Sequence, residues 1–336
     1  HTVRVFDDMF EERFPEKWEE LLLQRKAVHD ADLDGLRHTA AIICQGHEVA
    51  ERLWRYRGLP SAVMHPPMEL TNFQQGSAGD YLFIASRLHP WKRIDLSVRA
   101  VLASSRADLR LLIAGTGEAA DDLRRLAGND PRIEFLGRIS DEQLIELYAG
   151  CLAVPFTPIR EDFGYATLEA FASGKPVVTV TDSGEPGRLV LHGVNGLISA
   201  PEPESLSRAF ETLFDDREQA AAMGQAGLAV ARRFDWNQTI TTLREYALGE
   251  RRVTLDEYES TRILITDMQP ITPAVGGGRL RLLGLYHGTG ENTRCTYVGT
   301  YDWPGEPARD NQITNSLREI TVPLTPAHHE RSAAQS

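Results

Sequence analysis

Residues 151–180 read CLAVPFTPIREDFGYATLEAFASGKPVVTV, and this stretch decides the fold class. It opens with an apolar run of strand length, Cys151 to Phe156, and closes with another, Pro176 to Val180. Between them a polar, glycine-containing loop leads into a helical segment, Ala166 to Ala172. Two buried strands joined by a crossover helix predict a parallel sheet that is covered by helices.

The same alternation extends upstream of this stretch. Tyr81 to Ala85 and Leu109 to Ala114 read as strands, and Ile94 to Ala103 reads as the helix between them. The sequence therefore predicts an α/β fold with Rossmann-like, doubly wound parallel sheets. Because such sheets bind ligands at the carboxyl ends of their strands, residues that directly follow a strand are the candidates for a binding site.

Length and charge exclude several classes of protein. The 336 residues suffice for about two domains. With 36 basic and 48 acidic side chains the net charge is −12, which gives no general attraction for nucleic acid. No apolar run reaches the roughly 20 residues that span a bilayer. The three cysteines are too sparse for a disulfide framework or a zinc pair, so buried thiols in a reducing cytoplasm are expected: Cys44, Cys151 and Cys295.

Two polar stretches divide the chain. Residues 71–80 contain glycine and predict a domain boundary, and the charged stretch 250–261 predicts a linker. After the linker a new α/β unit is expected, with strand Ile263–Thr266, glycine turn Gly276–Gly278, helix Arg279–Tyr286 and strand Thr293–Gly299. The chain opens inside an apparent strand, Thr2–Phe6, which suggests a piece of a longer protein.

Two cations follow the strand that ends at Ala85. Arg87 and Lys92 are five residues apart across a loop that contains Pro90. Arginine supplies a planar fork of donors and lysine a mobile point charge, so the pair can converge on one diphosphate. A solvated basic loop explains the same residues equally well when they are taken alone.

A second candidate follows the strand that ends at Phe156. Gly164 lets the backbone approach a ligand closely just before a helix. The first N–H groups of that helix are unpaired donors suited to phosphate, namely those of Tyr165, Ala166 and Thr167.

Two carboxylates flank this helix start. Glu161 precedes the helix and Glu169 lies within it, so they are expected to accept hydrogen bonds from hydroxyls at different points along a long ligand. The alternative for Glu161 is simple complementation of the helix dipole. That alternative is weaker for Glu169, because an unpaired carboxylate at the start of an apolar face would be costly.

A third candidate is a glycine turn, G-x-G-x-x-A, over residues 115–120. With Glu134, interpreted as the end of the next strand, it has the outline of a dinucleotide fingerprint. However, it follows the second strand of its domain, and its third glycine is Ala120. A tight strand-to-helix turn is the favoured interpretation, and an NAD-dependent oxidoreductase is the alternative function.

These motifs together resemble a known family. Residues 81–248 are similar to the C-terminal domain of retaining GT-B glycosyltransferases of the family-4 type, the glycosyl transferases group 1. The series runs in order through S-R-L-x-x-x-K, A-G-x-G, F-L-G-R-x-S-D-E-x-L, E-x-F-G-x-x-x-L-E-A-x-A-S-G-K-P-V-V and G-V-N-G-L. The spacing of Glu161 and Glu169 is that of the family's E-x7-E motif. The resemblance covers about half of the chain and implies a GT-B type fold.

The resemblance also implies a role for each candidate residue. It implies catalysis by Glu161; diphosphate binding by Arg87, Lys92, Tyr165, Ala166 and Thr167; donor-sugar binding by Phe163 and Gly164; ribose binding by Glu169; and contact with the base by Gly137, Arg138 and Ile139. No metal and no separate cofactor is implied, because cations and the helix N-terminus carry the charge of the leaving diphosphate. The implied transfer takes place on one face of the sugar and retains its configuration.

The resemblance assigns the domains as well. Residues 1–75 are expected to be the C-terminal part of an acceptor-side Rossmann-like domain and 76–250 the nucleotide-sugar-binding domain. Residues 251–261 form the linker, and 262–336 start a second N-terminal glycosyltransferase-like domain. A piece of a tandem protein is preferred to a circular permutation, and such a piece is expected to be inactive alone. Asp7 stands where many members carry a histidine before Asp8-Met9, which places an acceptor-side role in doubt.

The sequence thus predicts a hexosyltransferase-type enzyme that uses a nucleotide-sugar donor. A glycan or lipid-linked acceptor, a role in polysaccharide biosynthesis and a cytoplasmic location with peripheral contact at the inner membrane face follow by family analogy only. No nucleic-acid partner is expected. A non-catalytic module that binds sugar nucleotides stays open beside the oxidoreductase alternative.

Overall fold

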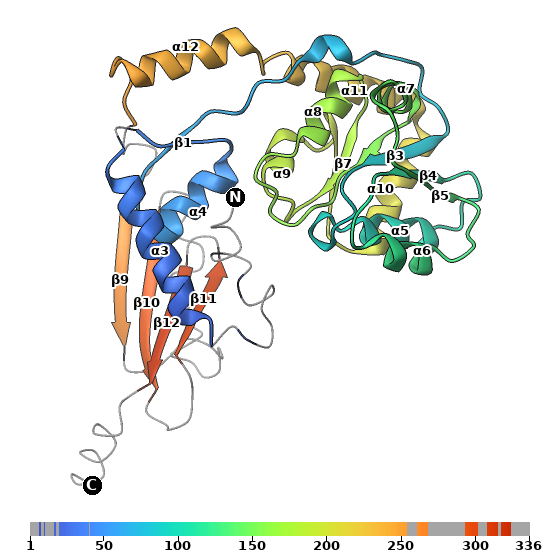
Figure 1. Cartoon of the computed structure of the whole chain (residues 1–336). Coiled ribbons are helices and arrows are strands. Elements are labelled where there is room, and N and C mark those ends of the chain that lie inside the picture. The colour runs from blue at the N-terminus through green and yellow to red at the C-terminus, as the bar shows by residue number, and fades with distance from the viewer. Residues whose placement is uncertain are drawn as a thin grey trace, which may run out of the picture. The chain divides into compact units, whose positions relative to one another are not determined.

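The computed structural model describes residues 7, 10, 17, 20–39, 41–253, 261–267, 293–301, 308–314 and 317–323 (Figure 1). The chain forms two compact units, residues 1–253 and residues 254–336. The division between them falls inside the expected linker. The finer boundary expected at residue 75 stays a prediction.

A parallel sheet organises the first unit. Its strands are β3 (Tyr81–Ala85), β4 (Arg110–Ala114), β5 (Ile133–Gly137), β6 (Val154–Pro155), β7 (Val177–Val180) and β8 (Gly196–Ser199). Two three-stranded parallel sheets, β3-β4-β5 and β6-β7-β8, are joined by a parallel bridge between Leu82 and Ala153. The spatial order is therefore β5-β4-β3-β6-β7-β8, and the predicted doubly wound α/β class is confirmed.

Helices cover both faces of this sheet. They are α5 (Ile94–Ala103), α6 (Ala120–Ala127), α7 (Asp141–Gly150), α8 (Tyr165–Ala172), α9 (Glu185–Leu189), α10 (Pro203–Asp215), α11 (Arg217–Ala231) and α12 (Trp236–Ala247). Alternation along the strands separates two cores. Leu82 and Ile84 pack with residues of α5, α6 and α10, whereas Phe83 packs with residues of α7, α8 and α9. Both faces are buried, which explains why the strands read as continuous apolar runs.

The strand order creates a switch point between β3 and β6. From β3 the chain turns to α5 on one face, and from β6 it turns to α8 on the other. The two departing loops, residues 86–93 and 156–164, consequently start from neighbouring positions at the carboxyl edge. Open parallel sheets bind ligands in the crevice at such a point.

The N-terminal part of this unit supplies shorter elements. They are α3 (Leu22–Arg37), β1 (Ile43–Cys44), α4 (His47–Arg57), β2 (Ala62–Val63) and the 3-10 turn η1 (Leu70–Asn72). β1 and β2 pair in parallel. The apparent opening strand Thr2–Phe6 lies outside the described residues.

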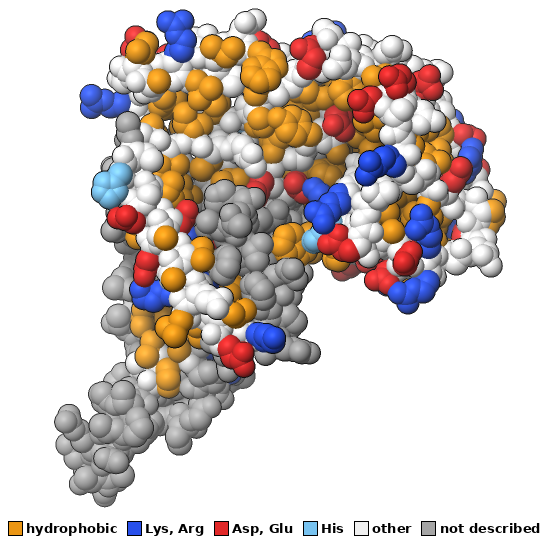
Figure 2. Space-filling view, in the orientation of Figure 1, with side chains coloured by type: hydrophobic (Ala, Val, Ile, Leu, Met, Phe, Trp, Pro, Cys, Tyr) orange, Lys and Arg blue, Asp and Glu red, His pale blue; other side chains and the backbone are white. Residues whose placement is uncertain are grey.

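α12 carries an exposed apolar row. Trp236, Ile240 and Leu243 are spaced by four and three residues, so they share one helix face, and each is exposed. Figure 2 shows hydrophobic side chains along this helix at the top of the view.

The second unit contains a four-stranded sheet. Its strands are β9 (Thr261–Asp267), β10 (Thr293–Tyr301), β11 (Arg309–Thr314) and β12 (Leu317–Pro323), in the order β11-β12-β10-β9. β9, β10 and β12 are parallel, and β11 is antiparallel to β12. The strands expected at 263–266 and 293–299 are present, and β9 begins at Thr261, the last residue of the expected linker. Gly276–Gly278 and Arg279–Tyr286 lie outside the described residues, and the assignment to a second N-terminal domain stays a prediction.

All three cysteines are buried free thiols, as expected: Cys44, Cys151 and Cys295. Burial raises the pKa of Cys151 to about 12, so this thiol stays protonated at neutral pH. Among the described helices, none is both long and apolar enough to cross a bilayer.

Candidate functional site

Lys92 and Glu161 meet at the switch point. Lys92 ends the 3-10 turn η2 (Pro90–Lys92) in the loop after β3, and Glu161 lies in the loop after β6. Lys92 Nζ is 2.6 Å from Glu161 Oε2, and the side chains are 28 % and 17 % exposed. The ammonium also lies 5.5 Å from the centre of the Phe156 ring. The structure thus joins two residues that are 69 positions apart in the sequence.

The loop after β7 holds the backbone of Glu161. Glu161 N–H donates to the carbonyl of Ser183 (2.8 Å), and Glu185 N–H donates to the carbonyl of Glu161 (3.0 Å). Gly184, between them, has φ +80°, and a Cβ there would lie 2.6 Å from Glu161 N and O. The sequence predicted only a turn for residues 182–186, so their role in supporting Glu161 was not predicted. Its one signal is a glycine in a polar loop directly after a strand.

Helix α8 begins directly after the loop that carries Glu161. Gly164 is its N-cap in the left-handed region, with φ +83°. Within the described part of the chain, the N–H groups of Tyr165 and Ala166 have no hydrogen-bond partner. The prediction of a third unpaired donor is wrong, because Thr167 N–H donates to the carbonyl of Gly164 (3.0 Å) as the first turn tightens.

Phe163 contributes to packing. Its side chain is buried, and its ring centre lies 5.0 Å from that of Tyr165 and 5.6 Å from that of His65. A contact between this residue and a sugar would therefore have to come from its backbone. Phe163 thereby fixes the loop that carries Glu161 and Gly164.

Arg87 faces a second part of the edge. Its exposed guanidinium lies 3.1 Å from Glu118, whose other carboxylate oxygen lies 3.1 Å from His89 Nε2. Arg87 lines a cavity of about 500 Å³ at the ends of β3, β4 and β5. The same cavity is lined by Gly115, Arg138 and Ile139. Arg87, which is predicted to bind the diphosphate, thus lines the same cavity as Arg138 and Ile139, which are expected near the base.

The glycine turn packs against the Arg87 loop. A Cβ at Gly115 would lie 1.9 Å from the carbonyl oxygen of Ser86, and Leu88 N–H donates to the carbonyl of Thr116 (3.0 Å). Gly115 N–H donates to the carbonyl of Gly137 (2.7 Å). Close packing therefore accounts for this turn, as favoured from the sequence.

Glu134 does not fit a dinucleotide site. It was expected to end its strand, but β5 runs on to Gly137, so Glu134 lies near the amino end. Its carboxylate is 3.8 Å from Arg110, the first residue of β4. The expectation is wrong because the strand continues through two apolar residues after Glu134. An acidic group at the opposite edge cannot bind a ribose in the cavity.

Glu169 is half-buried on α8. Tyr148, fully buried on α7, donates its hydroxyl to Glu169 Oε2 at 2.7 Å. Burial raises the pKa of Glu169 above its ordinary value of 4.5, and the hydrogen bond from Tyr148 lowers it in part. Burial likewise holds the pKa of Tyr148 well above 10.0.

We expect Tyr148→Phe to lower the free energy of unfolding by about 1–3 kcal/mol at neutral pH. Because the pKa of Glu169 is raised in the fold, ionised Glu169 costs stability as pH rises through that pKa, and the Tyr148 hydroxyl offsets part of this cost. The loss should therefore shrink at acidic pH, where Glu169 is protonated. Urea unfolding at two pH values measures this loss of stability.

Tyr81→Phe is the matched control, since the Tyr81 hydroxyl donates to the neutral carbonyl of Leu147 (3.0 Å). The stability lost in Tyr81→Phe should therefore not change with pH. The same pH dependence in both variants would contradict the role assigned to the Tyr148–Glu169 hydrogen bond.

Asp7 forms two ion pairs within the described part of the chain. Its buried carboxylate lies 3.1 Å from Arg57 Nη1 and 2.8 Å from His29 Nε2. Asp8 and Met9 lie outside the described residues. The residue at the family's histidine position thus forms ion pairs with side chains of the N-terminal part of the unit.

Comparisons with known proteins identify a family model and relatives that part of this chain resembles. Residues 71–230 match the family model described as glycosyl transferases group 1. D-inositol 3-phosphate glycosyltransferase of Corynebacterium efficiens is 33 % identical over 168 residues, which cover 47 % of this chain and 40 % of that protein. Alpha-1,3/1,6-mannosyltransferase ALG2 of Mus musculus is 37 % identical over 115 residues, 34 % of this chain and 28 % of that protein.

A solved structure shares the fold. HepE of Anabaena, in complex with UDP and glucose, superimposes with a TM-score of 0.58 at 23 % identity, covering 64 % of each chain. This chain spans less than half of the length of the two curated relatives. Residues 71–230 therefore match the glycosyl transferases group 1, on the mixed α/β fold of GT-B glycosyltransferases.

Proposed function

We propose that residues 76–250 bind a nucleotide-diphosphate sugar and that the whole protein transfers its sugar to a glycan or lipid-linked acceptor with retention of configuration. The observation that carries this proposal is the meeting of Lys92 and Glu161, 2.6 Å apart, at the switch point of the sheet. Such a crevice is where open α/β sheets take nucleotides. A cation and a hydrogen-bond acceptor side by side suit the phosphate and the sugar of one ligand.

The chemistry of the step follows from charge. As the sugar leaves, negative charge develops on the diphosphate, and Lys92, Arg87 and the free N–H groups at the start of α8 are preorganised donors for it. Glu161 then faces the sugar hydroxyls. The acceptor oxygen bonds to the sugar carbon on the face from which the diphosphate departs, and its proton passes to the departing diphosphate oxygen. Glu169 is assigned to the ribose, and Gly137, Arg138 and Ile139 to the base. These donors suffice in kind, so we assign no metal and no cofactor to this step.

The relatives support a hexose donor and an acceptor with hydroxyl groups. The names of two of them specify transfer to inositol 3-phosphate and transfer of mannose, and HepE was solved with UDP and glucose. We therefore propose a hexosyltransferase in polysaccharide or glycolipid assembly. A cytoplasmic location with peripheral contact at the inner membrane face is part of the same proposal.

Calorimetric titration of the full chain with UDP, GDP, ADP and NAD, without added metal, tests the proposal. Binding of one nucleoside diphosphate would support it and identify the base. Binding of NAD alone would favour the oxidoreductase and overturn it. Absence of binding to all four would contradict an intact donor site and favour a degenerate module.

Glu161→Ala should reduce turnover far more than binding of the free nucleotide. We expect sugar transfer or donor hydrolysis by the whole protein to fall about 100- to 1000-fold, the size found when one preorganised polar group is removed from a reaction centre. Affinity for the free nucleoside diphosphate should be kept, because the variant removes a negative charge beside Lys92. Glu134→Ala, at the opposite edge of the sheet, is the control. Equal losses of turnover and binding would point to a structural role for Glu161.

A further inference from the structure

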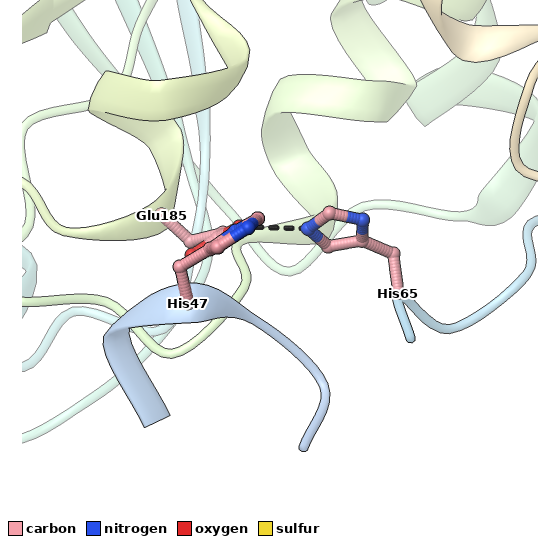
Figure 3. Close-up of side chains that lie close together, drawn as sticks. All are labelled: His47, His65 and Glu185. Carbon is pink, nitrogen blue, oxygen red and sulfur yellow. Dashed lines mark hydrogen bonds and ion pairs between the residues drawn. The ribbon is translucent and has the colours of Figure 1, made fainter. Parts of the chain in front are cut away.

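Two histidines and one glutamate converge beside the site. His47 is the first residue of α4, His65 follows β2, and Glu185 is the first residue of α9. His47 Nδ1 lies 3.0 Å and His65 Nε2 lies 2.7 Å from the same oxygen, Glu185 Oε1. Figure 3 shows both imidazole rings directed at this carboxylate. Three segments that are far apart in the sequence thus point donor atoms at one position.

The carboxylate at the centre is fully buried. Glu185 is 0 % exposed, whereas the His47 and His65 side chains are 50 % and 25 % exposed. Its second oxygen accepts a hydrogen bond from the backbone N–H of Glu48 (3.1 Å). Across the described residues, no lysine or arginine forms an ion pair with it. The cost of burying this charge must be offset by hydrogen bonds, and among the described residues two imidazoles and one N–H supply them.

We propose that His47, His65 and Glu185 bind a divalent transition-metal ion of the zinc class. The three donor atoms lie within 4.8 Å of one another. With Zn–N and Zn–O bonds of about 2.0–2.1 Å, two ligands of a tetrahedral ion are about 3.3 Å apart, which is close to the two contacts above. Two histidines and a glutamate are a donor set that zinc uses, with solvent as the fourth ligand.

The surroundings suit a bound ion. His65 is positioned by ring contacts with Phe163 and Phe234, at 5.6 and 5.3 Å between ring centres. The half-exposed His47 leaves a path for the ion and a place for water. Each imidazole would bind through the nitrogen that faces Glu185 and keep its proton on the other nitrogen. Protons held on the facing nitrogens are released or moved to the other nitrogen as the ion binds.

The ion would connect the N-terminal part of the unit to the candidate donor site. Glu185 N–H donates to the carbonyl of Glu161, so a metal that fixes Glu185 also fixes the backbone of Glu161. None of the three ligands is a residue that we assign to the diphosphate. This inference therefore stands whether or not the proposed function holds.

Metal binding by the full chain tests the proposal. The adjacent His328 and His329 form a second place where zinc could bind, so the experiment uses the His328→Ala/His329→Ala background. After removal of metal with a chelator, we expect one Zn²⁺ per chain by calorimetry and a higher melting temperature with Zn²⁺. Co²⁺ in place of Zn²⁺ should give the visible absorption of a four-coordinate ion.

Variants locate the site. His47→Ala and His65→Ala should each weaken Zn²⁺ binding by at least about tenfold and abolish the Co²⁺ spectrum, since losing even an outer-shell partner costs 10- to 100-fold. Glu185→Gln keeps the shape of the buried side chain and should weaken binding similarly. His38→Ala is the matched control, because His38 is an exposed imidazole beside Asp34 and is not one of the three residues of the cluster. No Zn²⁺ binding in the background chain, or binding that persists unchanged in His47→Ala, would overturn the proposal.

Discussion

Lys92→Ala is expected to weaken binding of a nucleoside diphosphate by about 10- to 100-fold. A hydrogen bond to a charged group contributes about 1.5–3 kcal/mol, and phosphate is among the strongest acceptors. Lys92 is well placed for such a bond, because its ammonium is only 28 % exposed and already lies beside one carboxylate oxygen. The loss should decrease at high salt, which screens the attraction. Calorimetric titration at two salt concentrations measures both effects.

Two controls separate binding from folding. Lys92→Arg keeps the charge and should retain part of the affinity. Arg110→Ala removes an exposed cation at the amino edge of the sheet and should leave affinity unchanged. Urea unfolding of Lys92→Ala shows whether loss of the Glu161 partner destabilises the unit. Unchanged nucleotide affinity in a folded Lys92→Ala chain would remove Lys92 from the site.

Arg52→Met is expected to lower the free energy of unfolding of the first unit by about 3–5 kcal/mol. Arg52 on α4 forms a salt bridge with Asp162, and both residues are buried. Removing the guanidinium leaves a buried carboxylate without that cation, whereas the methionine keeps most of the side-chain volume. Asp162 directly follows Glu161, so nucleotide affinity should fall as well. Urea unfolding and the titration above measure the two effects.

The double variant Arg52→Met/Asp162→Asn is the informative control. Replacing both members of a buried ion pair is often nearly neutral, so the double variant should recover much of the lost stability. Arg106→Met, which breaks surface ion pairs with Asp108 and Asp215, should cost less than about 1 kcal/mol. A comparable cost for Arg52→Met would show that the buried pair contributes little.

Local sequence patterns predicted the sheet well. Runs such as Leu111–Ala114 are apolar throughout, and the structure buries them between helices on both faces. Parallel order then sends the loops after consecutive strands to one edge. Lys92 and Glu161 could therefore be expected at the same edge from the sequence alone. Their contact depends on β3 and β6 being neighbours, which the doubly wound class implies.

The remaining features depend on contacts that no local pattern carries. Glu185 is 138 residues from His47 and 120 from His65, so a turn-rich loop gave no indication of the cluster. The N–H group of Thr167 is not available to a ligand because the first turn of α8 tightens and pairs it with a carbonyl. Helix ends are the least regular part of a helix, so the sequence does not predict this. The prediction placed Glu134 at the wrong end of its strand, because β5 continues past Glu134 to Gly137. The roles assigned by family resemblance stay predictions.

The buried thiols offer a way to measure how the molecule opens over time. One cysteine lies in each of the three predicted domains: Cys44 in residues 1–75, Cys151 in residues 76–250 and Cys295 in residues 262–336. A thiol reagent can reach each of them only when its surroundings open transiently, so each labelling rate reports the opening equilibrium of its own region. Three different labelling rates would show that the three parts open independently of one another. A shared rate for Cys44 and Cys151 would show that the N-terminal part opens together with the sheet, as one cooperative body.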